Sequence, residues 1–410
     1  MTKEVLQKYA KLAVCSGVNV QPDQLLIINA SVKDYEFVEM CVEEAYKAGA
    51  SEVIVKWNDE NIRHMDYEYQ KLETLCDIPD WAEERVKWEH DRKCCYLSIS
   101  SGTPGFMADI DPEKMKQSMI ASMKRMSKYQ AYTMNNQGQW SVIALPNPKW
   151  AKIVFPDKDE DEAVKALWDA ILFSVRVRED NDPVAEWEKH DKALEAHCDI
   201  LNAHQFKAMH FSNKKGTDLT VNLVKNHIWV GGGCTTPDGV FFNPNMPTEE
   251  CFCMPDRNNV NGTVYASKPL SYSGKVIEDF WFRFENGQVV EYGAAKNEEA
   301  LKQLLDTDEG SKRLGEVALI SYDSPISNLN VLFFNTLFDE NASCHLALGR
   351  CYPENVEGGI EMSKEELLAA GGNDSMNHVD FMFGTSDMTV TGIKEDGSTV
   401  TVFSEGNFVI

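Results

Sequence analysis

The sequence of 410 residues lacks any excess of positive charge. Lys and Arg together number 40 against 65 Asp and Glu, which gives a formal net charge of −25. Nucleic acids and anionic membrane surfaces are bound through clustered Lys and Arg, so neither is an expected partner. The sequence also has no run of about 18 apolar residues, and we therefore expect no membrane-spanning helix.

Cysteine is present, but not in the spacing of a protein held together by disulfides. The eleven cysteines are an odd number spread along the chain, and free thiols are typical of a reducing compartment. The N-terminal stretch MTKEVLQKYAKLAVCSG has the spacing of an amphipathic helix and lacks the apolar core of a signal peptide. We therefore expect a cytoplasmic protein.

Several catalytic motifs are missing as well. The sequence contains no G-x-S-x-G, no G-x-x-x-x-G-K-[ST] and no H-E-x-x-H. The glycines at 231–233 predict a turn rather than a phosphate-binding loop. His190, His197 and His204 recur every seven residues on one predicted helix, but successive members are about 10.5 Å apart along the axis. One ion cannot bridge that distance, so these histidines are expected to pack or to face solvent.

Helices and strands alternate in the first half of the chain. The apolar runs predict strands at 25–31, 52–57, 94–100 and 140–146, and helical spacing covers 2–16, 34–50 and a stretch opened by Asp111-Pro112. Such alternation predicts an α/β domain with a mostly parallel sheet covered by helices. Residues 157–206 are expected to be mostly helical, with a break at 181–183.

The pattern changes beyond about residue 207. Short strands follow one another, separated by turns, and the sequences ENGQ (285–288) and EDGS (395–398) predict tight hairpins. Interspersed helical stretches make this half an α+β, strand-rich domain. We place the boundary near 190–207 and expect two domains, 1–195 and 196–410.

Four segments of the second half carry acidic, imidazole or phenol groups in otherwise apolar, turn-rich surroundings. Their potential ligands are Glu250, Glu316, Glu340, His345, Tyr352, His378 and Asp380. Buried carboxylates are rare unless they are paired or bind a metal. His378 and Asp380 are two residues apart, so a strand would place both on one face. His345 and Tyr352 are seven apart and would share one face of a helix, unless Gly349 ends that helix first.

The charges in these segments suit a pair of divalent cations. Glu250, Glu316 and Asp380 supply −3 against +4, and an ionised Tyr352 or a hydroxide would supply the rest. Mixed nitrogen and oxygen ligands favour Zn, Co or Mn over a closed cysteine site. Two ions about 3.5–4 Å apart can polarise a carbonyl and lower the pKa of a water molecule. The pattern therefore predicts a dimetal hydrolytic site.

The ordered stretches NMPTEECF, GTVYASKPLSY, RLGEVAL, DENASCHLALG and HVDFMFG resemble the metallopeptidase family of aminopeptidase T and aminopeptidase S. Weaker similarity extends through GTDLTVNL and WVGG to the N-terminal YAKLAVCSGVNVQPDQ, and so covers nearly the whole chain. The resemblance implies a two-metal aminopeptidase that removes N-terminal residues from peptides. It also implies an N-terminal α/β domain, a C-terminal metal domain and a homodimer.

The resemblance also assigns roles to individual residues. Carried over by motif, the metal ligands are Glu250, Glu316, His345, Tyr352, His378 and Asp380. Glu316 would bridge the two ions, and either Glu316 or Glu340 would be the catalytic carboxylate that moves the proton. Glu340 is a candidate for a general base or for a further ligand. Glu249 is expected to be a solvated neighbour or a group outside the ligand set.

The sequence departs from the family pattern at its cysteines. Cys251 and Cys253 stand where relatives tend to have an aliphatic and a hydroxyl residue, and Cys344 and Cys351 flank expected ligands. A rival zinc site built from these four thiolates is disfavoured because C-x-C is not the usual spacing. On a strand, Cys251 and Cys253 would also point away from the face that Glu250 uses. We expect thiols that pack beside the site.

Two alternatives to the aminopeptidase remain open from the residues alone. One is another two-metal hydrolase, such as an esterase or amidase, which would use the same ligands. The other is a metal-binding scaffold that has lost turnover.

Overall fold

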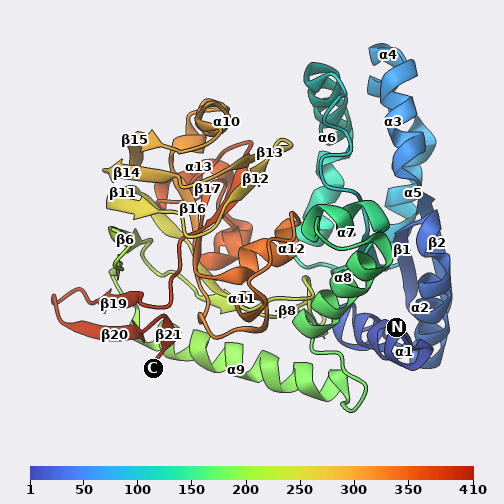
Figure 1. The fold of residues 1–410 in the computed structure, drawn as a ribbon, viewed down its shortest axis with the longest axis horizontal. Coiled ribbons are helices and arrows are strands. Elements are labelled where there is room, and N and C mark those ends of the chain that lie inside the picture. Colours follow the sequence, from blue (N-terminus) through green and yellow to red (C-terminus); the bar gives the residue numbers. More distant parts are fainter. The chain divides into compact units, whose positions relative to one another are not determined.

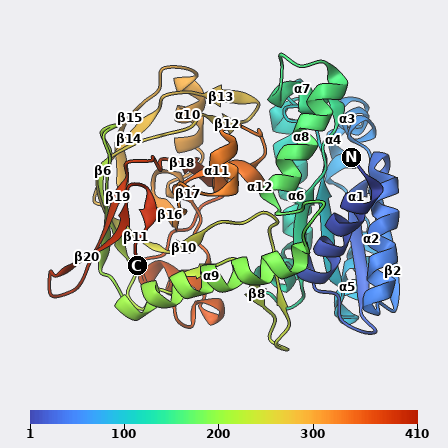
Figure 2. The same cartoon turned by 60° about the horizontal axis from the view of Figure 1, so that its bottom comes forward.

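The computed structural model describes residues 1–410 and divides into two compact units. Unit 1 consists of residues Met1–Lys189 and Gly233–Pro247, and unit 2 consists of His190–Gly232 and Thr248–Ile410. The chain therefore enters each unit twice (Figures 1 and 2). None of the helices combines the length and the apolar character that a membrane span requires.

Unit 1 is built on a four-stranded sheet with the order β2-β1-β3-β4. Its strands are β1 (Leu25–Ser31), β2 (Glu52–Asn58), β3 (Cys95–Ser100) and β4 (Trp140–Ala144). All three pairings are parallel. Parallel neighbours need crossover connections, and helices supply them here, as the alternating pattern predicts. The predicted α/β fold with a mostly parallel sheet is confirmed.

The helices expected at 2–16, at 34–50 and from Asp111-Pro112 onward are present, 157–206 is mostly helical as expected, and four further helices were not predicted. The helices of unit 1 are α1 (Lys3–Leu12), which continues as a π-helical turn over Ala13–Gly17, α2 (Tyr35–Ala48), α3 (Glu60–Tyr69), α4 (Leu72–Cys76), α5 (Asp80–Asp91), α6 (Pro112–Met134), α7 (Pro148–Val154) and α8 (Glu160–Ser174). The next helix, α9 (Pro183–His204), begins in unit 1 and lies mostly in unit 2. Gly49 ends α2 in the left-handed conformation, with φ 101°. Asp111 caps α6 by accepting a hydrogen bond from the backbone N–H of Glu113 at 2.9 Å.

The segment 233–247 packs against β4 within unit 1. It carries the short antiparallel pair β8 (Cys234–Thr235) and β9 (Phe241–Phe242). The backbone N–H of Val142 donates to Pro244 O at 2.7 Å, and the N–H of Met246 donates to Val142 O at 3.0 Å. The segment therefore covers the exposed edge of β4, and Met246 is fully buried there.

Unit 2 contains two larger antiparallel sheets. The five-stranded sheet has the order β18-β17-β16-β10-β7, and the eight-stranded sheet has the order β15-β14-β11-β6-β5-β19-β20-β21. The strands of the first are β7 (Val230–Gly231), β10 (Cys251–Cys253), β16 (Leu314–Leu319), β17 (His345–Gly349) and β18 (His378–Met382). Those of the second are β5 (Ala208–Ser212), β6 (Asp218–Leu223), β11 (Pro255–Tyr265), β14 (Trp281–Glu285), β15 (Gln288–Gly293), β19 (Thr389–Ile393), β20 (Thr399–Ser404) and β21 (Asn407–Phe408). Together they make unit 2 strand-rich, as expected.

Smaller elements complete unit 2. They are the hairpin of β12 (Leu270–Tyr272) and β13 (Lys275–Ile277) and the helices α10 (Glu298–Leu305), α11 (Pro325–Leu329), α12 (Thr336–Asp339) and α13 (Lys364–Ala369). The two predicted tight turns are present. Asn286 and Gly287, with φ 51° and 79°, join β14 to β15, and Asp396-Gly397 lies between β19 and β20.

The five-stranded sheet has one apolar face and one polar face. On the apolar face the side chains belong to the core of unit 2, and they are Cys251, Cys253, Leu314, Val317, Leu319, Leu346, Leu348 and Phe381, with Val379 packed against them. Because side chains alternate along a strand, the residues between them face the other way. Those residues include Glu316, His345, His378 and Asp380, so most of the predicted ligands share the polar face.

A β-bulge in β16 produces this arrangement. Leu314 pairs with Leu348 and Glu316 pairs with Ala347, so Gly315 is an extra residue in β16. Without it, Leu314 and Glu316 would lie on the same face. The bulge lets Leu314 enter the core while Glu316, two residues later, turns toward the polar face.

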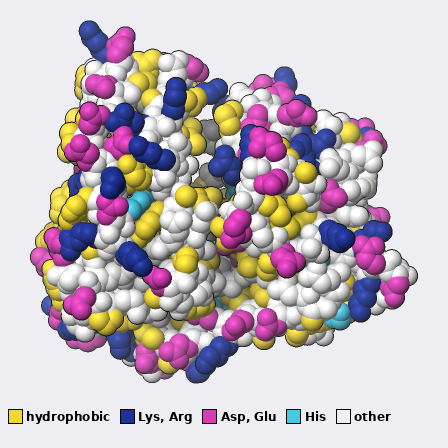
Figure 3. Space-filling model, turned by 180° about the vertical axis from the view of Figure 1, so that it is seen from behind, with side chains coloured by type: hydrophobic (Ala, Val, Ile, Leu, Met, Phe, Trp, Pro, Cys, Tyr) yellow, Lys and Arg dark blue, Asp and Glu magenta, His cyan; other side chains and the backbone are white.

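Acidic and basic side chains are interspersed with hydrophobic ones on the face shown in Figure 3.

Candidate metal centre

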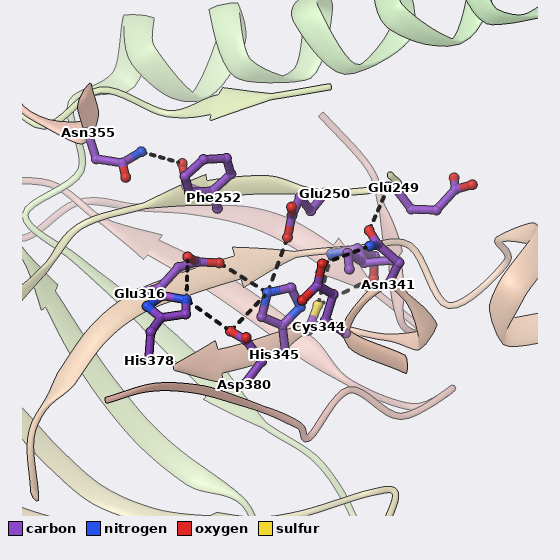
Figure 4. Close-up of polar contacts among 12 residues, drawn as sticks. Glu249, Glu250, Phe252, Glu316, Asn341, Cys344, His345, Asn355, His378 and Asp380 are labelled. Carbon is purple, nitrogen blue, oxygen red and sulfur yellow. Dashed lines mark hydrogen bonds and ion pairs between the residues drawn. The ribbon is translucent and has the colours of Figure 1, made fainter. Parts of the chain in front are cut away.

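Five of the predicted ligands meet on the polar face of the five-stranded sheet. Glu250 immediately precedes β10, Glu316 lies in β16, His345 begins β17, and His378 and Asp380 lie in β18. Figure 4 shows these five side chains pointing toward one another. The expectation that His378 and Asp380 share a strand face is confirmed.

The side chains are close enough to share ions. His345 Nε2 lies 3.2 Å from Glu250 Oε2 and 3.1 Å from Glu316 Oε1. His378 Nε2 lies 3.5 Å from Glu316 Oε2 and 3.4 Å from Asp380 Oδ1. Glu316 and His345 are almost inaccessible to solvent, with 4% and 1% of their surface exposed. The centre is therefore a buried cluster in which two carboxylate oxygens of one residue face two different imidazoles.

The donor atoms fall into two groups that could each hold a cation. One group is Glu250, Glu316 and His345, and the other is Glu316, His378 and Asp380, with the donor atoms of each group within 4.8 Å of one another. Glu316 belongs to both groups. His378 is also oriented from outside the cluster, because its Nδ1–H donates to Arg350 O at 2.7 Å and leaves Nε2 free to face the carboxylates.

Hydrogen bonds within the protein leave the cluster incomplete. Asp380 Oδ1 is buried without a hydrogen-bond partner and lies 3.4 Å from His378 Nε2. His345 Nδ1 is also buried without a partner. Nitrogen and oxygen donors of this kind suit Zn, Co and Mn. The residues therefore fit divalent cations for two reasons: the donor atoms are of the right chemical type, and two buried polar atoms of the cluster have no hydrogen-bond partner.

The carboxylates make both histidines strongly basic. Burial alone would lower the pKa of His345, but hydrogen bonds to Glu250 and Glu316 outweigh burial and raise it well above its usual value. Burial is likewise outweighed at His378, where Asp380 and Glu316 raise the pKa to about 10. Two imidazolium charges thus replace cations in the metal-free protein, and a binding metal would have to displace those protons.

The pKa values of the Glu316 and Asp380 carboxylates are shifted in opposite directions. Burial raises the pKa of Glu316, although the hydrogen bond from His345 opposes the shift. Burial would also raise the pKa of Asp380, but the positive charge of His378 outweighs it and lowers that pKa. Asp380 is therefore the more firmly ionised of the two.

Glu340 and Tyr352 adjoin the cluster without belonging to either group of donors. Glu340 begins a 3₁₀ turn over Glu340–Ala342, and burial together with the nearby carboxylates of Asp380 and Glu250 raises its pKa well above normal. The Tyr352 ring packs against the rings of His378, at 4.8 Å, and Phe252, at 5.8 Å. Burial and the carboxylates raise the pKa of its phenol as well, so Tyr352 is neutral in the metal-free protein.

The expectation of a helix through His345 and Tyr352 is wrong. Residues His345–Gly349 form β17, paired on both sides with β16 and β18. Gly349 does end the element, but in the left-handed region with φ 117°, and Tyr352 follows in a loop. Pairing with two neighbouring strands decides the structure of this short apolar run, which periodicity alone could not assign.

Cysteines contribute to neither group of donors. Cys251 and Cys253 have no exposed surface and belong to the core on the apolar face of the sheet, opposite the face that carries the ligands. Burial raises the pKa of both Cys344 and Cys351 to about 11, which disfavours thiolates. All eleven cysteines are free. The expectation of packing thiols agrees with this geometry.

Glu249 is buried, so of the two expectations for it the solvated neighbour is wrong and a group outside the ligand set remains. Only 8% of its surface is exposed, and its side chain points away from the cluster (Figure 4). Its carboxylate lies 3.8 Å from His190 Nε2 of α9, and its backbone N–H donates to Asn341 Oδ1 at 2.8 Å. Glu249 thus helps to fix the segment that carries Glu250.

Sequence reasoning missed the residues that hold the ligands in place. Asn341 is fully buried and also donates to Leu337 O at 3.3 Å. Asn355 donates to Phe252 O at 3.2 Å, which anchors β10 just after Glu250. A buried amide leaves no periodic signal in a sequence, although the position of Asn341 directly after Glu340 could have drawn attention to it.

The three histidines of α9 form no metal site. His190 Nε2 lies 2.7 Å from Thr248 O, His197 stacks on Phe408 with ring centroids 4.1 Å apart, and His204 stacks on Phe206 at 4.8 Å. The expectation that they pack is confirmed.

The fold and the donor set define a two-unit protein with a candidate metal centre on a sheet of its C-terminal half. The family model Peptidase_M29, thermophilic metalloprotease (M29), matches residues 2–408, and the chain belongs to this family. It is 43% identical over 403 residues to aminopeptidase AmpS of Bacillus subtilis (strain 168), covering 98% of each chain. It is 41% identical over 407 residues to aminopeptidase T of Thermus aquaticus, covering 99% of each. The predicted class, a metalloaminopeptidase, is confirmed at the level of the family.

Solved structures agree with this assignment. The structure of wild-type AmpT from Thermus thermophilus superposes with a TM-score of 0.92 at 38% identity and covers all of both chains. A 2,5-dihydroxypyridine dioxygenase from Pseudomonas putida KT2440 superposes with a TM-score of 0.53 at 10% identity, a likeness of fold alone. The predicted fold class is therefore confirmed for the whole chain.

Proposed function

We propose that this protein removes N-terminal residues from peptides with a pair of divalent metal ions bound at the cluster. The observation that supports the pair is the position of Glu316, which is shared by the two groups of donors. In this assignment Glu316 would be a ligand of both ions. The other ligands are Glu250, His345, Tyr352, His378 and Asp380. Their mixed nitrogen and oxygen atoms favour Zn, Co or Mn.

The residues divide the chemistry of peptide hydrolysis among them. Bound ions at this place supply a Lewis acid for the scissile carbonyl and lower the pKa of the attacking water. Glu340 accepts the proton from that water and passes it to the leaving amine, because it lines a cavity together with Asp380 but belongs to neither group of donors. Glu316 is the alternative for this role, although a carboxylate shared by two ions is a poorer base.

Selectivity for chain ends follows from the charge of the site. The carboxylates of Asp380 and Glu250 lie close enough to Glu340 to act on it electrostatically, and such a concentration of acidic groups would attract the positively charged α-ammonium group of a peptide. An acetylated or internal peptide bond offers no such charge.

Three further properties belong to this proposal. The chain is a homodimer, since a restricted entrance excludes folded proteins from an exopeptidase. It works in the cytoplasm, in accord with its free thiols. Its domains are residues 1–195 and 196–410.

The test compares aminoacyl-p-nitroanilides with their N-acetylated counterparts after removal and return of metal. We expect cleavage of the free-amine substrates only, loss of that cleavage on chelation, and recovery with Zn, Co or Mn. A general two-metal amidase or esterase would also cleave acetylated amides or esters. A binding scaffold would cleave neither. Full turnover by metal-free protein would contradict the mechanism.

A further inference from the structure

A cavity in unit 1 takes no part in the proposed function. It has a volume of about 400 Å³ and lies between the C-terminal ends of α5 and α6 and the loop that joins β8 to β9. All of its lining residues belong to unit 1, whereas the candidate metal ligands belong to unit 2. Sites for small molecules usually have volumes of about 300–1,000 Å³. The cavity is therefore large enough for a ligand of its own.

One wall of the cavity consists of aromatic rings. His90 and Tyr132 both line it, and their rings are stacked with centroids 3.9 Å apart and planes 10° apart. Tyr129 also lines the cavity, and its ring meets that of His90 edge to face, with centroids 5.8 Å apart. The phenol of Tyr132 is held in place because it donates a hydrogen bond to Cys94 O at 2.7 Å. The wall is therefore a fixed surface against which another aromatic ring can pack.

The charged residues of the lining are balanced. They are two lysines and two aspartates, Lys93, Lys128, Asp91 and Asp238. Burial lowers the pKa of His90 below its usual value, so the imidazole adds no charge at neutral pH. A purely anionic or purely cationic ligand would be attracted by one pair of residues and repelled by the other. The lining therefore favours a ligand that carries one charge of each sign.

Two of these charges lie side by side. Lys93 Nζ lies 2.6 Å from Asp238 Oδ2, and the two side chains are 74% and 67% exposed. An exposed ion pair of this kind contributes little to stability, so both groups can turn to a ligand without greatly destabilising the fold. Lys128 and Asp91, in contrast, each pair with a side chain outside the lining. Lys93 and Asp238 are therefore the charges that a ligand can use.

An aromatic α-amino acid has the chemistry that this lining requires. Its ammonium and carboxylate groups are attached to the same carbon atom, so they lie side by side as the charges of Lys93 and Asp238 do. An apolar cavity of about 150 Å³ holds a benzene ring, and the remaining volume of this cavity accommodates the rest of the amino acid. A peptide also has an ammonium group and can have a ring, but its carboxylate is at the far end of the chain.

We propose that this cavity binds a free aromatic amino acid as the zwitterion. The carboxylate of the ligand pairs with Lys93, its ammonium group pairs with Asp238, and its ring packs against His90 and Tyr129. Removal of an N-terminal aromatic residue from a peptide would release such a molecule, so the ligand is a product of the proposed reaction. Binding at this cavity needs neither metal nor turnover. The proposal can therefore hold or fail independently of the proposed function.

The first test is calorimetry with L-phenylalanine on the full chain, with and without a chelator. We expect binding in both conditions. Phenylalaninamide lacks the carboxylate, N-acetylphenylalanine lacks the ammonium group and alanine lacks the ring. Each should bind at least about tenfold more weakly, because each loses one of the three contacts. Absence of L-phenylalanine binding in the chelated protein would refute the proposal. Equal binding of phenylalaninamide would also refute it, because the site would then accept peptides.

A variant that fills the cavity locates the bound molecule. Ala131 is an exposed residue of α6 in the lining, so Ala131→Trp should weaken binding of L-phenylalanine at least about tenfold. Ala196→Trp makes the same change at an exposed position of α9 outside the cavity, and should leave the affinity unchanged. Equal affinities in these two variants would place the site elsewhere and overturn the assignment.

A second pair of variants tests the charge that meets the carboxylate, at exposed positions where folding is not at risk. Lys93→Gln should weaken binding of L-phenylalanine at least about tenfold, because it removes one charge-assisted hydrogen bond. Lys47→Gln is the control, since Lys47 is also exposed and forms an ion pair with Glu43 in α2, at 2.9 Å and outside the cavity. It should leave the affinity unchanged. Parental affinity in Lys93→Gln would contradict the proposed pairing.

Discussion

Glu316 is the residue on which the two candidate ion sites depend. Its oxygens lie 3.1 Å from His345 Nε2 and 3.5 Å from His378 Nε2, so the same carboxylate contacts both halves of the cluster. Glu316→Gln keeps the shape of the side chain and removes one negative charge. We expect loss of at least one ion per chain and a fall in activity by orders of magnitude, because water activation and carbonyl polarisation need both ions.

The measurement is metals per chain on the purified variant, with Glu299→Gln, an exposed change in α10, as the control. Stability should fall in the metal-loaded form, since bound metal stabilises the native state by mass action. The loss should be smaller in the metal-free form, where the substitution removes the partner of the His345 and His378 imidazolium groups but also relieves repulsion among carboxylates. Two ions at full occupancy in Glu316→Gln would exclude the bridging role.

Measurements of activity and of metals per chain can also distinguish whether Glu340 is a metal ligand or the group that moves the proton. If it moves the proton, Glu340→Gln should lower kcat by about 10²–10⁴ while leaving the metal content intact. A simultaneous loss of metal would make it a ligand instead. The outcome decides a role that neither the sequence motif nor the position of Glu340 beside the cluster determines.

Protons and metal ions should compete for His378. Its pKa in the metal-free protein, about 10, lies above the value of about 6.5 for an unfolded chain. Its contribution to stability is therefore complete below pH 6.5 and is lost as the pH rises through 10. Metal binding has the opposite dependence, because the ion requires the neutral imidazole.

We expect the apparent metal affinity to rise between pH 6 and 9, by about tenfold per pH unit for each proton released. Calorimetry in two buffers of different ionisation enthalpy counts those protons directly. An affinity that does not change over this range would show that His378 is already neutral before the ion binds.

At the scale of the element, the bulge in β16 determines which face Glu316 occupies. A Cβ atom on Gly315 would lie 2.2 Å from Arg350 O and 2.4 Å from Gly349 O, so Gly315→Ala must displace backbone rather than a flexible side chain. We expect a loss of roughly 1–3 kcal/mol in the free energy of unfolding, as for other overpacked sites, together with reduced metal content.

The control is Gly102→Ala, where an added Cβ meets nothing within 4 Å. Denaturant unfolding and metal analysis on both variants are the measurements. If Gly315→Ala retains parental stability and full metal content, the bulge does not position Glu316.

At the scale of single elements, the sequence correctly predicted the features that depend on residues close together in the chain. The end of α2 at Gly49 and the Asn286-Gly287 hairpin follow from the backbone preferences of single residues. The position of His378 and Asp380 on one face of β18 follows from the alternation of side chains along a strand. Residues 345–349 were misassigned because pairing with strand residues 27 or more positions away in the sequence governs them. The bulge at Gly315 depends on contacts with residues 349 and 350, which no local pattern contains.

For the whole molecule, the proposed homodimer is a prediction about mass in solution. Light scattering across micromolar concentrations should give about twice the chain mass of 46.3 kDa. The physical reason is the restricted entrance that a second subunit would provide. A single species at the monomer mass throughout that range would rule out a dimer under these conditions.

The whole-chain family resemblance was recognisable from a few ordered motifs, and the match to residues 2–408 confirms it. The proposed domains, 1–195 and 196–410, rest on a change of sequence texture near residue 207. The pattern of predicted helices and strands does not show that 233–247 packs within unit 1. The contacts responsible join this segment to β4, about a hundred residues earlier in the chain.

The position of this segment has a consequence for how the protein is made. A ribosome adds about 5–20 residues per second, so residues 233–247 leave it several seconds after residue 189. During that interval β4 has been synthesised but its edge, with Val142, still awaits Pro244 and Met246. The N-terminal half of a nascent chain is therefore an unfinished unit with an open strand, and its folding is completed only when part of the following half has been translated.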